Sequence, residues 1–152
     1  MGGEATAPLK MQVLKIDPAT TTLAGTVALP GVRWSEGDTP LGHLLATDSA
    51  VWVARPQAGF VDRIDPQAGA IVNSFKISEL NLPDTPTLAF DSLWVLGLNS
   101  SKVMPLNPQT GEPTGQHLEV DVPLASHMVG APRALWLLGV EGNQLIKVTT
   151  SN

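Results

Sequence analysis

The stretch that decides the fold runs from residue 92 to residue 111 and reads SLWVLGLNSSKVMPLNPQTG. It holds a tryptophan in an apolar run and, twelve residues later, the end of a second apolar run followed by a Pro- and Gly-containing turn. Both markers recur with a period of 42 residues, at Trp52, Trp94 and Trp136 and at Ile64, Leu106 and Val148. Two markers that share one period predict a repeat protein.

The turn after the second run supports the same repeat. Asp65-Pro66 and Asn107-Pro108 each precede a glycine three residues further on, which is typical of a tight turn between antiparallel strands. An earlier copy at Asp17-Pro18 lies 48 residues before Asp65-Pro66, so six extra residues fall between these two copies. The repeat therefore extends over nearly the whole chain.

Each repeat reads as four strands. Short runs rich in Val, Ile, Leu and Trp alternate with Gly, Pro, Asn and Asp, and no stretch shows sustained helical periodicity. In the middle unit we expect strands at residues 87–90, 93–98, 102–106 and 116–120. Four antiparallel strands in a unit of this length predict the blade of a β-propeller. We therefore expect an all-β chain with a flexible leader over residues 1–10 and about three blades over residues 11–152.

Composition excludes several classes of function. The 152 residues are 43% hydrophobic, and the 14 acidic and 9 basic side chains give a net charge of −5 without a basic cluster. This charge argues against binding to nucleic acid or to an anionic membrane surface. No apolar run approaches the roughly 18 residues of a membrane-spanning helix. The chain has no cysteine, no Gly-rich phosphate loop and no motif that predicts a cofactor or a metal site.

The repeat also resembles a known group. Residues 50–54 with 59–69, and 92–95 with 102–111, are similar to the repeats of YVTN and NHL-like bacterial propellers, including the virginiamycin B lyase-like ones. The resemblance implies a propeller whose ligands bind at the mouth of the central channel. It also favours a location outside the cytoplasm. Propellers of this group serve as enzymes, sensors and scaffolds, so the resemblance predicts the fold more sharply than the function.

Two histidines are the candidate catalytic residues. His43 and His127 each lie nine residues before a blade tryptophan, a position that falls near Thr85 or Pro86 in the middle blade. In virginiamycin B lyase-like enzymes a histidine at a comparable place follows a proline and serves as catalytic base. No proline precedes either histidine here, and no acidic partner is assigned. An exposed histidine at the end of a strand is the simpler explanation of the same pattern.

Further candidates for ligand binding come from the loops on the same face. The six-residue insertion contains Arg33 and Trp34, and Trp34 is the one tryptophan that the repeat does not explain. Burial of Trp34 against a blade edge is an equally good explanation. Arg55, Asn99 and Glu141 lie in or beside loops on this face.

The two ends of the chain predict an incomplete ring. The chain opens on a third and an outer strand and closes after a third strand, whereas closed propellers have roughly four to eight blades. An open array would expose two apolar faces, so we expect two copies to pair head to tail in a six-bladed ring, with the N-terminal strands of each completing the last blade of the other. The alternative is that the chain is one piece of a longer propeller.

Three functions fit the sequence. The first is a non-enzymatic module that binds a protein or a small ligand at the channel mouth. The second is a lyase or hydrolase that uses His43 and His127. The third is an architectural part of a larger propeller protein.

Overall fold

The computed structural model describes residues 11–31, 42–98, 100–121, 125–141 and 143–149. Within them the chain is built almost entirely of antiparallel strands, with one short 3-10 turn, η1, at Pro56–Ala58. The prediction of an all-β fold is confirmed. The expected leader over residues 1–10 lies outside the described residues.

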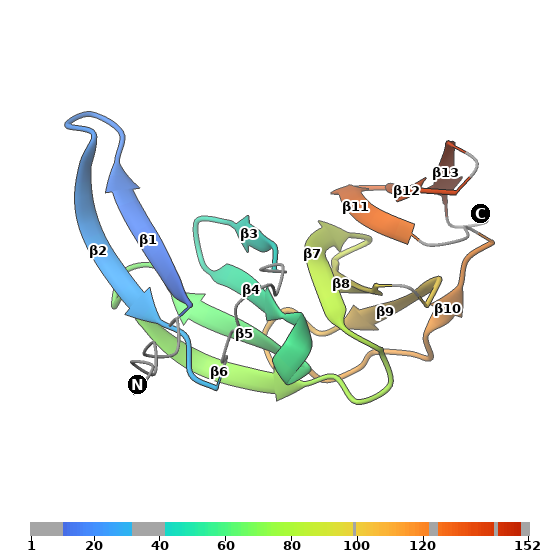
Figure 1. Ribbon diagram of the computed structural model, residues 1–152, viewed down its shortest axis with the longest axis horizontal. Coiled ribbons are helices and arrows are strands. Elements are labelled where there is room, and N and C mark those ends of the chain that lie inside the picture. The colour runs from blue at the N-terminus through green and yellow to red at the C-terminus, as the bar shows by residue number, and fades with distance from the viewer. Residues whose placement is uncertain (1–10, 32–41, 99, 122–124, 142, 150–152) are drawn as a thin grey trace, which may run out of the picture.

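Four sheets follow one another along the chain (Figure 1). The first holds two strands, and the second and third are complete blades with strand orders β3-β4-β5-β6 and β7-β8-β9-β10. The fourth holds β11, β12 and β13. The strand bounds are β1 Gln12–Asp17, β2 Thr22–Ala28, β3 Leu44–Ala46, β4 Val51–Arg55, β5 Phe60–Asp65, β6 Ala70–Lys76, β7 Pro83–Ala89, β8 Ser92–Gly97, β9 Lys102–Leu106, β10 Leu118–Glu119, β11 Ala125–Ala131, β12 Ala134–Gly139 and β13 Gln144–Val148.

The strands of the middle blade agree closely with the expectation. β8 and β9 lie where the sequence places them, β7 begins four residues earlier than residue 87, and the outer strand β10 has only two residues. The outer strand is short because its pairing with β9 is interrupted: Pro113 forms a single bridge with Leu106, and regular pairing resumes only at Leu118 and Glu119. The two complete blades and the two partial ones make a partial propeller of about three blades.

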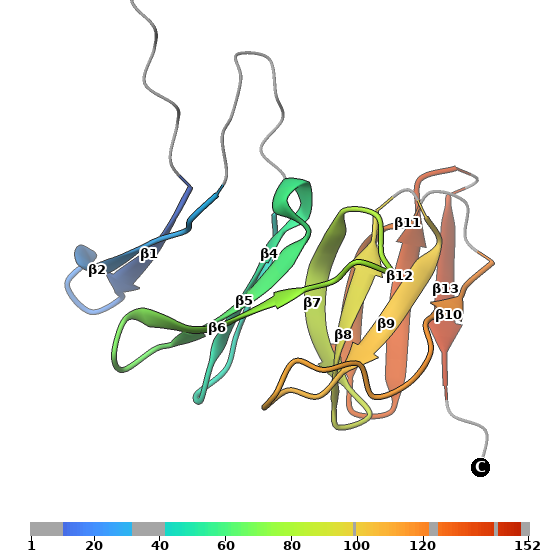
Figure 2. The same cartoon turned by 90° about the horizontal axis from the view of Figure 1, so that it is seen from below.

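The blades stack face to face, as the view from below shows (Figure 2). Trp52 and Val61 of one blade pack with Leu93, Val95 and Met104 of the next in one buried cluster. A second cluster repeats this arrangement, with Trp94 and Val103 against residues of β11 and β12. Apolar burial of this kind is the main stabilising term in such a stack. The periodic tryptophan therefore fills the space between blades, as the sequence predicts.

The repeated turns are Asx turns. Asp17, Asp65 and Asn107 each accept backbone N–H groups two or three residues further on, at 2.7–3.1 Å. These N–H groups stabilise the carboxylates, and the pKa values of Asp17 and Asp65 are lowered as a result. Gly69 and Gly111 end the later two turns with φ of +63° and +71°, which a side chain would strain. The motif is structural in all three copies.

The two ends of the stack expose apolar side chains. On β1 and β2 these are Leu14, Ile16 and Leu23, which are 54–59% exposed. On the last sheet they include Val129, Trp136, Leu138 and Leu145. Both faces would lie between blades in a closed ring.

Candidate functional site

His43 and the buried Asp84 form the centre of the candidate site. His43 directly precedes β3, and Asp84 lies in β7 of the neighbouring blade. The Nδ1 atom of His43 lies 3.0 Å from Oδ2 of Asp84, and the backbone N–H of His43 donates to Oδ1 at 2.9 Å. The carboxylate is fully buried, whereas the imidazole is 44% exposed. Asp84 therefore holds both the backbone and the ring of His43, and leaves the other side of the ring open to solvent.

A distorted strand presents this carboxylate. The pairing of β7 with β8 skips two residues between Asp84 and Thr87, so Thr85 lies in a bulge. Thr85 has a φ of +43°, which is strained for a β-branched residue, and its N–H donates to Oδ1 of Asp84 at 2.8 Å. Its own hydroxyl is buried with no hydrogen-bond partner among the described residues. Strain and an unsatisfied polar atom concentrate at functional sites more often than elsewhere.

Gly42 fixes the approach of the chain to His43. Its φ is +150°, and a Cβ atom there would lie 2.9 Å from the carbonyl oxygen of Ala54 and 2.7 Å from Cε of Met11. The backbone carbonyl of His43 accepts the N–H of Ala54 at 3.0 Å. A glycine before His43 thus lets the histidine backbone lie against β4 while its side chain turns toward Asp84.

His127 brings a second imidazole to the same place. It lies in β11, where the pairing with β12 has a bulge between Ala125 and His127, close to the repeat position of the bulge in β7. Its ring centroid is 5.2 Å from that of His43, and the two planes cross at 76° in an edge-to-face arrangement. Its Nδ1 atom lies 3.1 Å from Oγ of Ser126. The structure therefore brings together the two histidines that the repeat pattern singled out, although they belong to blades on either side of the middle one.

This arrangement suits proton transfer. A neutral imidazole that donates through Nδ1 to a carboxylate carries its lone pair on Nε2, so Asp84 selects the tautomer of His43 that can act as a base. Among the described residues, no carboxylate contacts His127, which presents a second, differently held imidazole. No three His, Asp or Glu side chains within the described residues are placed to bind a metal ion.

Arg55 lies outside this cluster. Its Nε atom is 2.6 Å from Oδ2 of Asp62, its Nη2 donates to Oδ1 at 2.8 Å, and both side chains are buried. Nη1 donates to the carbonyl of Pro30, and the guanidinium lies 5.0 Å from the ring centroid of Phe60. These contacts join the segment after β2 to the first complete blade. Arg55 is thus fully engaged in structural contacts.

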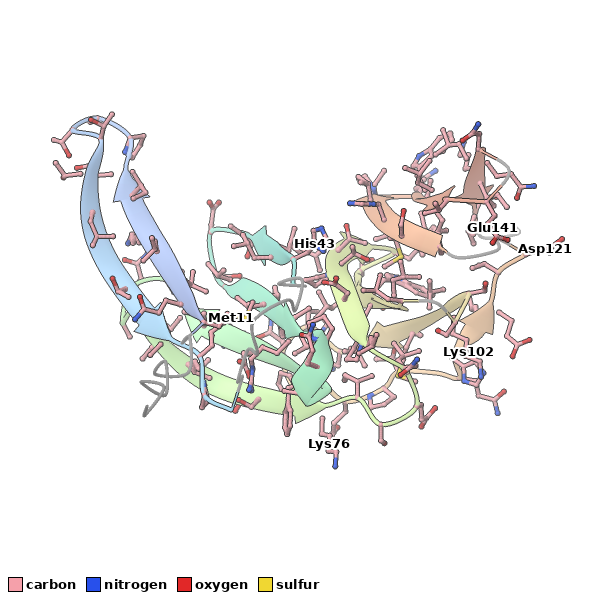
Figure 3. All side chains as sticks on the ribbon, in the orientation of Figure 1. Met11, His43, Lys76, Lys102, Asp121 and Glu141 are labelled. Atoms are coloured by element: carbon pink, nitrogen blue, oxygen red, sulfur yellow. The ribbon has the colours of Figure 1, made fainter. Side chains whose placement is uncertain are left out.

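The remaining candidate ligands are also separate from the histidines or outside the described residues. Glu141 is exposed between β12 and β13, and Figure 3 places it at the far end of the last sheet from His43. Arg33, Trp34 and Asn99 lie outside the described residues. Their roles as ligand contacts stay predictions.

Asp84 is a candidate site residue that the sequence pattern did not predict. Its position, directly before the place where His43 and His127 recur, carries Gly42 and Ser126 in the other repeats. An acidic residue next to the one repeat position that lacks histidine was the available signal. Asp-Thr-Pro also reads as an ordinary turn, which concealed it.

Comparison with solved structures shows the fold of the chain. Virginiamycin B lyase from Staphylococcus aureus is similar over 93% of this chain and 49% of its own, with a TM-score of 0.66 and 20% identity. A streptogramin B lyase matches over 88% of this chain and 46% of its own, with a TM-score of 0.62 and 17% identity. A Bacteroides caccae protein of unknown function matches over 92% and 56%, with a TM-score of 0.68 and 12% identity. The virginiamycin B lyase-like propeller fold is confirmed.

The matches cover only part of each solved structure. The chain spans about half the length of each of the three solved structures. No protein-family model and no curated protein matches the sequence. In the described part of the chain, no helix is long and apolar enough to cross a bilayer.

Proposed function

We propose that His43 and His127 form a proton-transfer site of the lyase or hydrolase type at one mouth of the propeller. The observation that carries the proposal is the 3.0 Å contact between Nδ1 of His43 and the buried carboxylate of Asp84. In this proposal Nε2 of His43 takes a proton from the substrate, and Asp84 is a positioning residue that acts through His43. The imidazole of His127 returns a proton to the leaving group. A positioned acid or base typically accelerates a reaction by about 10²–10⁴-fold.

The substrate class comes from the structural neighbours. Two of them are lyases named for virginiamycin B and streptogramin B. A lyase breaks a bond by elimination, which needs a base at the carbon that loses its proton and an acid at the leaving group. Two imidazoles with different partners supply this pair of roles. We therefore propose virginiamycin B as the first substrate to test.

The test is turnover of virginiamycin B followed by mass spectrometry. Elimination leaves the summed mass of the products unchanged, whereas hydrolysis adds one water, so the products identify the reaction type. His43→Gln should lower kcat by about 10²-fold or more. His117→Gln is the matched control, because His117 lies away from the site beside Glu79 and Glu119. No turnover, or turnover that His43→Gln leaves unchanged, contradicts the proposal.

Asp84→Asn tests the positioning role. The amide keeps the size of the carboxylate but can present an N–H to Nδ1, which favours the wrong tautomer of His43. We expect kcat to fall by about 10²-fold or more with KM little changed, and the pH–rate profile to shift. A purely structural role would instead lower stability and leave the profile of the folded fraction unchanged.

The binding module remains the second candidate function. The observation in its favour is that, among the described residues of the site, the Asp84 carboxylate contacts the imidazole of His43 and not that of His127, while both imidazoles are exposed to a ligand. Virginiamycin B that binds without turnover, with affinity lowered by His127→Ala, would support binding over catalysis. Calorimetric titration measures this directly.

We also propose that two chains close a ring of six blades. The exposed apolar faces at both ends of the stack support this assembly. Light scattering should give twice the 16.0 kDa of one chain. A stable monomer contradicts the ring and favours an architectural part of a longer propeller.

A further inference from the structure

The first and last described strands occupy the same place in the repeat. β1 and β13 both end where the third strand of a blade ends, at positions that correspond to Ile64 and Leu106. β1 pairs with an outer strand, β2, and has no inner neighbour among the described residues, whereas β13 pairs with β12 and has no outer neighbour there. If a blade were shared between two chains, it would therefore contain both β13 and β1, two copies of the third strand where a complete blade has one.

The two strands carry the same pattern of side chains. Residues 12–16 read Gln-Val-Leu-Lys-Ile, and residues 144–148 read Gln-Leu-Ile-Lys-Val. Neither of the other third strands has this pattern, because β5 places Asp62 and β9 places Pro105 within it. Each residue of β13 thus has a counterpart of the same character in β1.

The contacts that β13 makes with β12 could be made by β1. Ile146 lies opposite Leu137 and Val148 opposite Leu135, on the face that packs against the middle blade. Lys147 lies opposite Trp136, with its Nζ atom 5.3 Å from the indole centroid. In β1, the matching residues are Leu14, Ile16 and Lys15. The first two are 57% and 54% exposed in the single chain.

The groove beside β1 lies where the two inner strands of its blade would be expected. A groove of about 540 Å³ lies between the β1–β2 hairpin and the first complete blade, lined among others by Val13, Leu44 and Val51. Val51 corresponds to Leu93, which packs with Trp52 of the preceding blade. Leu44 is 57% exposed, and no inner strand of the described residues covers it. An added β11–β12 pair would bring Trp136 onto Val51.

We propose that β1 of a second copy replaces β13 on β12 when two chains assemble. The composite blade then has the order β11-β12-β1-β2, with the last two strands from the second copy, and each released β13 leaves the sheet. This inference rests on the ring of two chains proposed above, and it is independent of the histidine site. It specifies an interaction surface: the free edge of β1 with the adjoining groove, and the β11–β12 pair that fits it.

Disulfide trapping tests the exchange, since the natural chain has no cysteine. Leu138 lies opposite Leu145, and Val13 is the counterpart of Leu145. A mixture of V13C and L138C chains should form a covalent dimer on oxidation. The matched control is the double variant L138C/L145C, which should form a bond within one chain only when β13 stays on β12. Exchange therefore predicts the covalent dimer and little bonding within the control chain.

A reciprocal pair of substitutions provides a test without cysteines. Leu14→Asp should weaken dimer formation about 30-fold, the effect of losing a central apolar contact. Ile146→Asp weakens the strand that competes with β1, so it should strengthen dimer formation about tenfold. Light scattering over a concentration series measures both. Equal weakening by the two substitutions overturns the exchange.

The outcomes separate the exchange from the ring itself. A wild-type chain that stays monomeric overturns both. A dimer whose L138C/L145C variant closes within one chain, with no bond between V13C and L138C chains, overturns the exchange and leaves the ring. A covalent dimer with opposite effects of Leu14→Asp and Ile146→Asp supports the exchange.

Discussion

Trp52 and Trp94 differ from Trp136 although all three occupy one position of the repeat. The first two are 2% and 8% exposed, because each packs against the next blade. Trp136 is 36% exposed and contacts Lys147 of its own sheet. The indole is thus placed by the repeat, but whether it stabilises the fold depends on a neighbouring blade. The same local sequence has a core role inside the stack and leaves an exposed apolar side chain at its end.

The largest expected effect tests this difference directly. Trp52→Ala should lower the free energy of unfolding by about 3–5 kcal/mol, because a large buried side chain is removed from a packed interface. Trp136→Ala should lower it by about 1 kcal/mol or less at concentrations where the chain is monomeric. Urea denaturation followed by tryptophan fluorescence and circular dichroism measures both. Equal losses would mean that the two indoles have similar surroundings in solution.

Glycine substitutions test the same difference between the inside and the end of the stack at the backbone. Gly130 lies in β11, and an added Cβ atom would lie 2.0 Å from the carbonyl oxygen of Leu88 in β7. Gly130→Ala should therefore force the two inner strands apart and cost about 3 kcal/mol. Gly25 in the β1–β2 hairpin is the control, because its nearest contact would be the Lys15 side chain at 3.9 Å. A Gly130→Ala variant as stable as Gly25→Ala would contradict the close approach of the blades.

The smallest effect concerns a feature that the two regions share. The pKa values of Asp65 and Asp17 are lowered by backbone N–H groups, in a complete blade and in the end hairpin respectively. A lowered pKa in the folded state stabilises the protein above the ordinary value of 3.8, and this contribution is lost as the pH falls below that value. Replacement by Asn keeps the turn, as Asn107 shows, but removes this part of the acid sensitivity.

Denaturation from neutral pH to below pH 3.8 measures the effect. Asp65→Asn and Asp17→Asn should each flatten the acid limb slightly and to a similar degree, since both carboxylates are exposed. A loss of stability at neutral pH in either variant would mean that the carboxylate makes a further contact.

The candidate site shows where sequence reasoning stops. The period of the repeat identified His43 and His127, because equivalent positions of a propeller meet at one mouth. The repeat could not identify Asp84, because the contact of Asp84 with His43 depends on a bulge in β7 and on the strained backbone of Thr85. The sequence also placed Arg55 among the ligand contacts; this stays a prediction, and the structure shows contacts of Arg55 with Asp62 and Pro30. Side-chain direction at a strand end depends on bulges, which the apolar pattern does not record.

The sequence alone determined the blade architecture, because the spacing of Trp52, Trp94 and Trp136 and the Asx turns are local features with a single period. Only the tertiary structure decided which side chains meet across blades and how far the apolar side chains at the ends of the stack are exposed. The physical reason is distance along the chain. His43 and Asp84 are 41 residues apart, so their contact forms only when the neighbouring blades pack side by side.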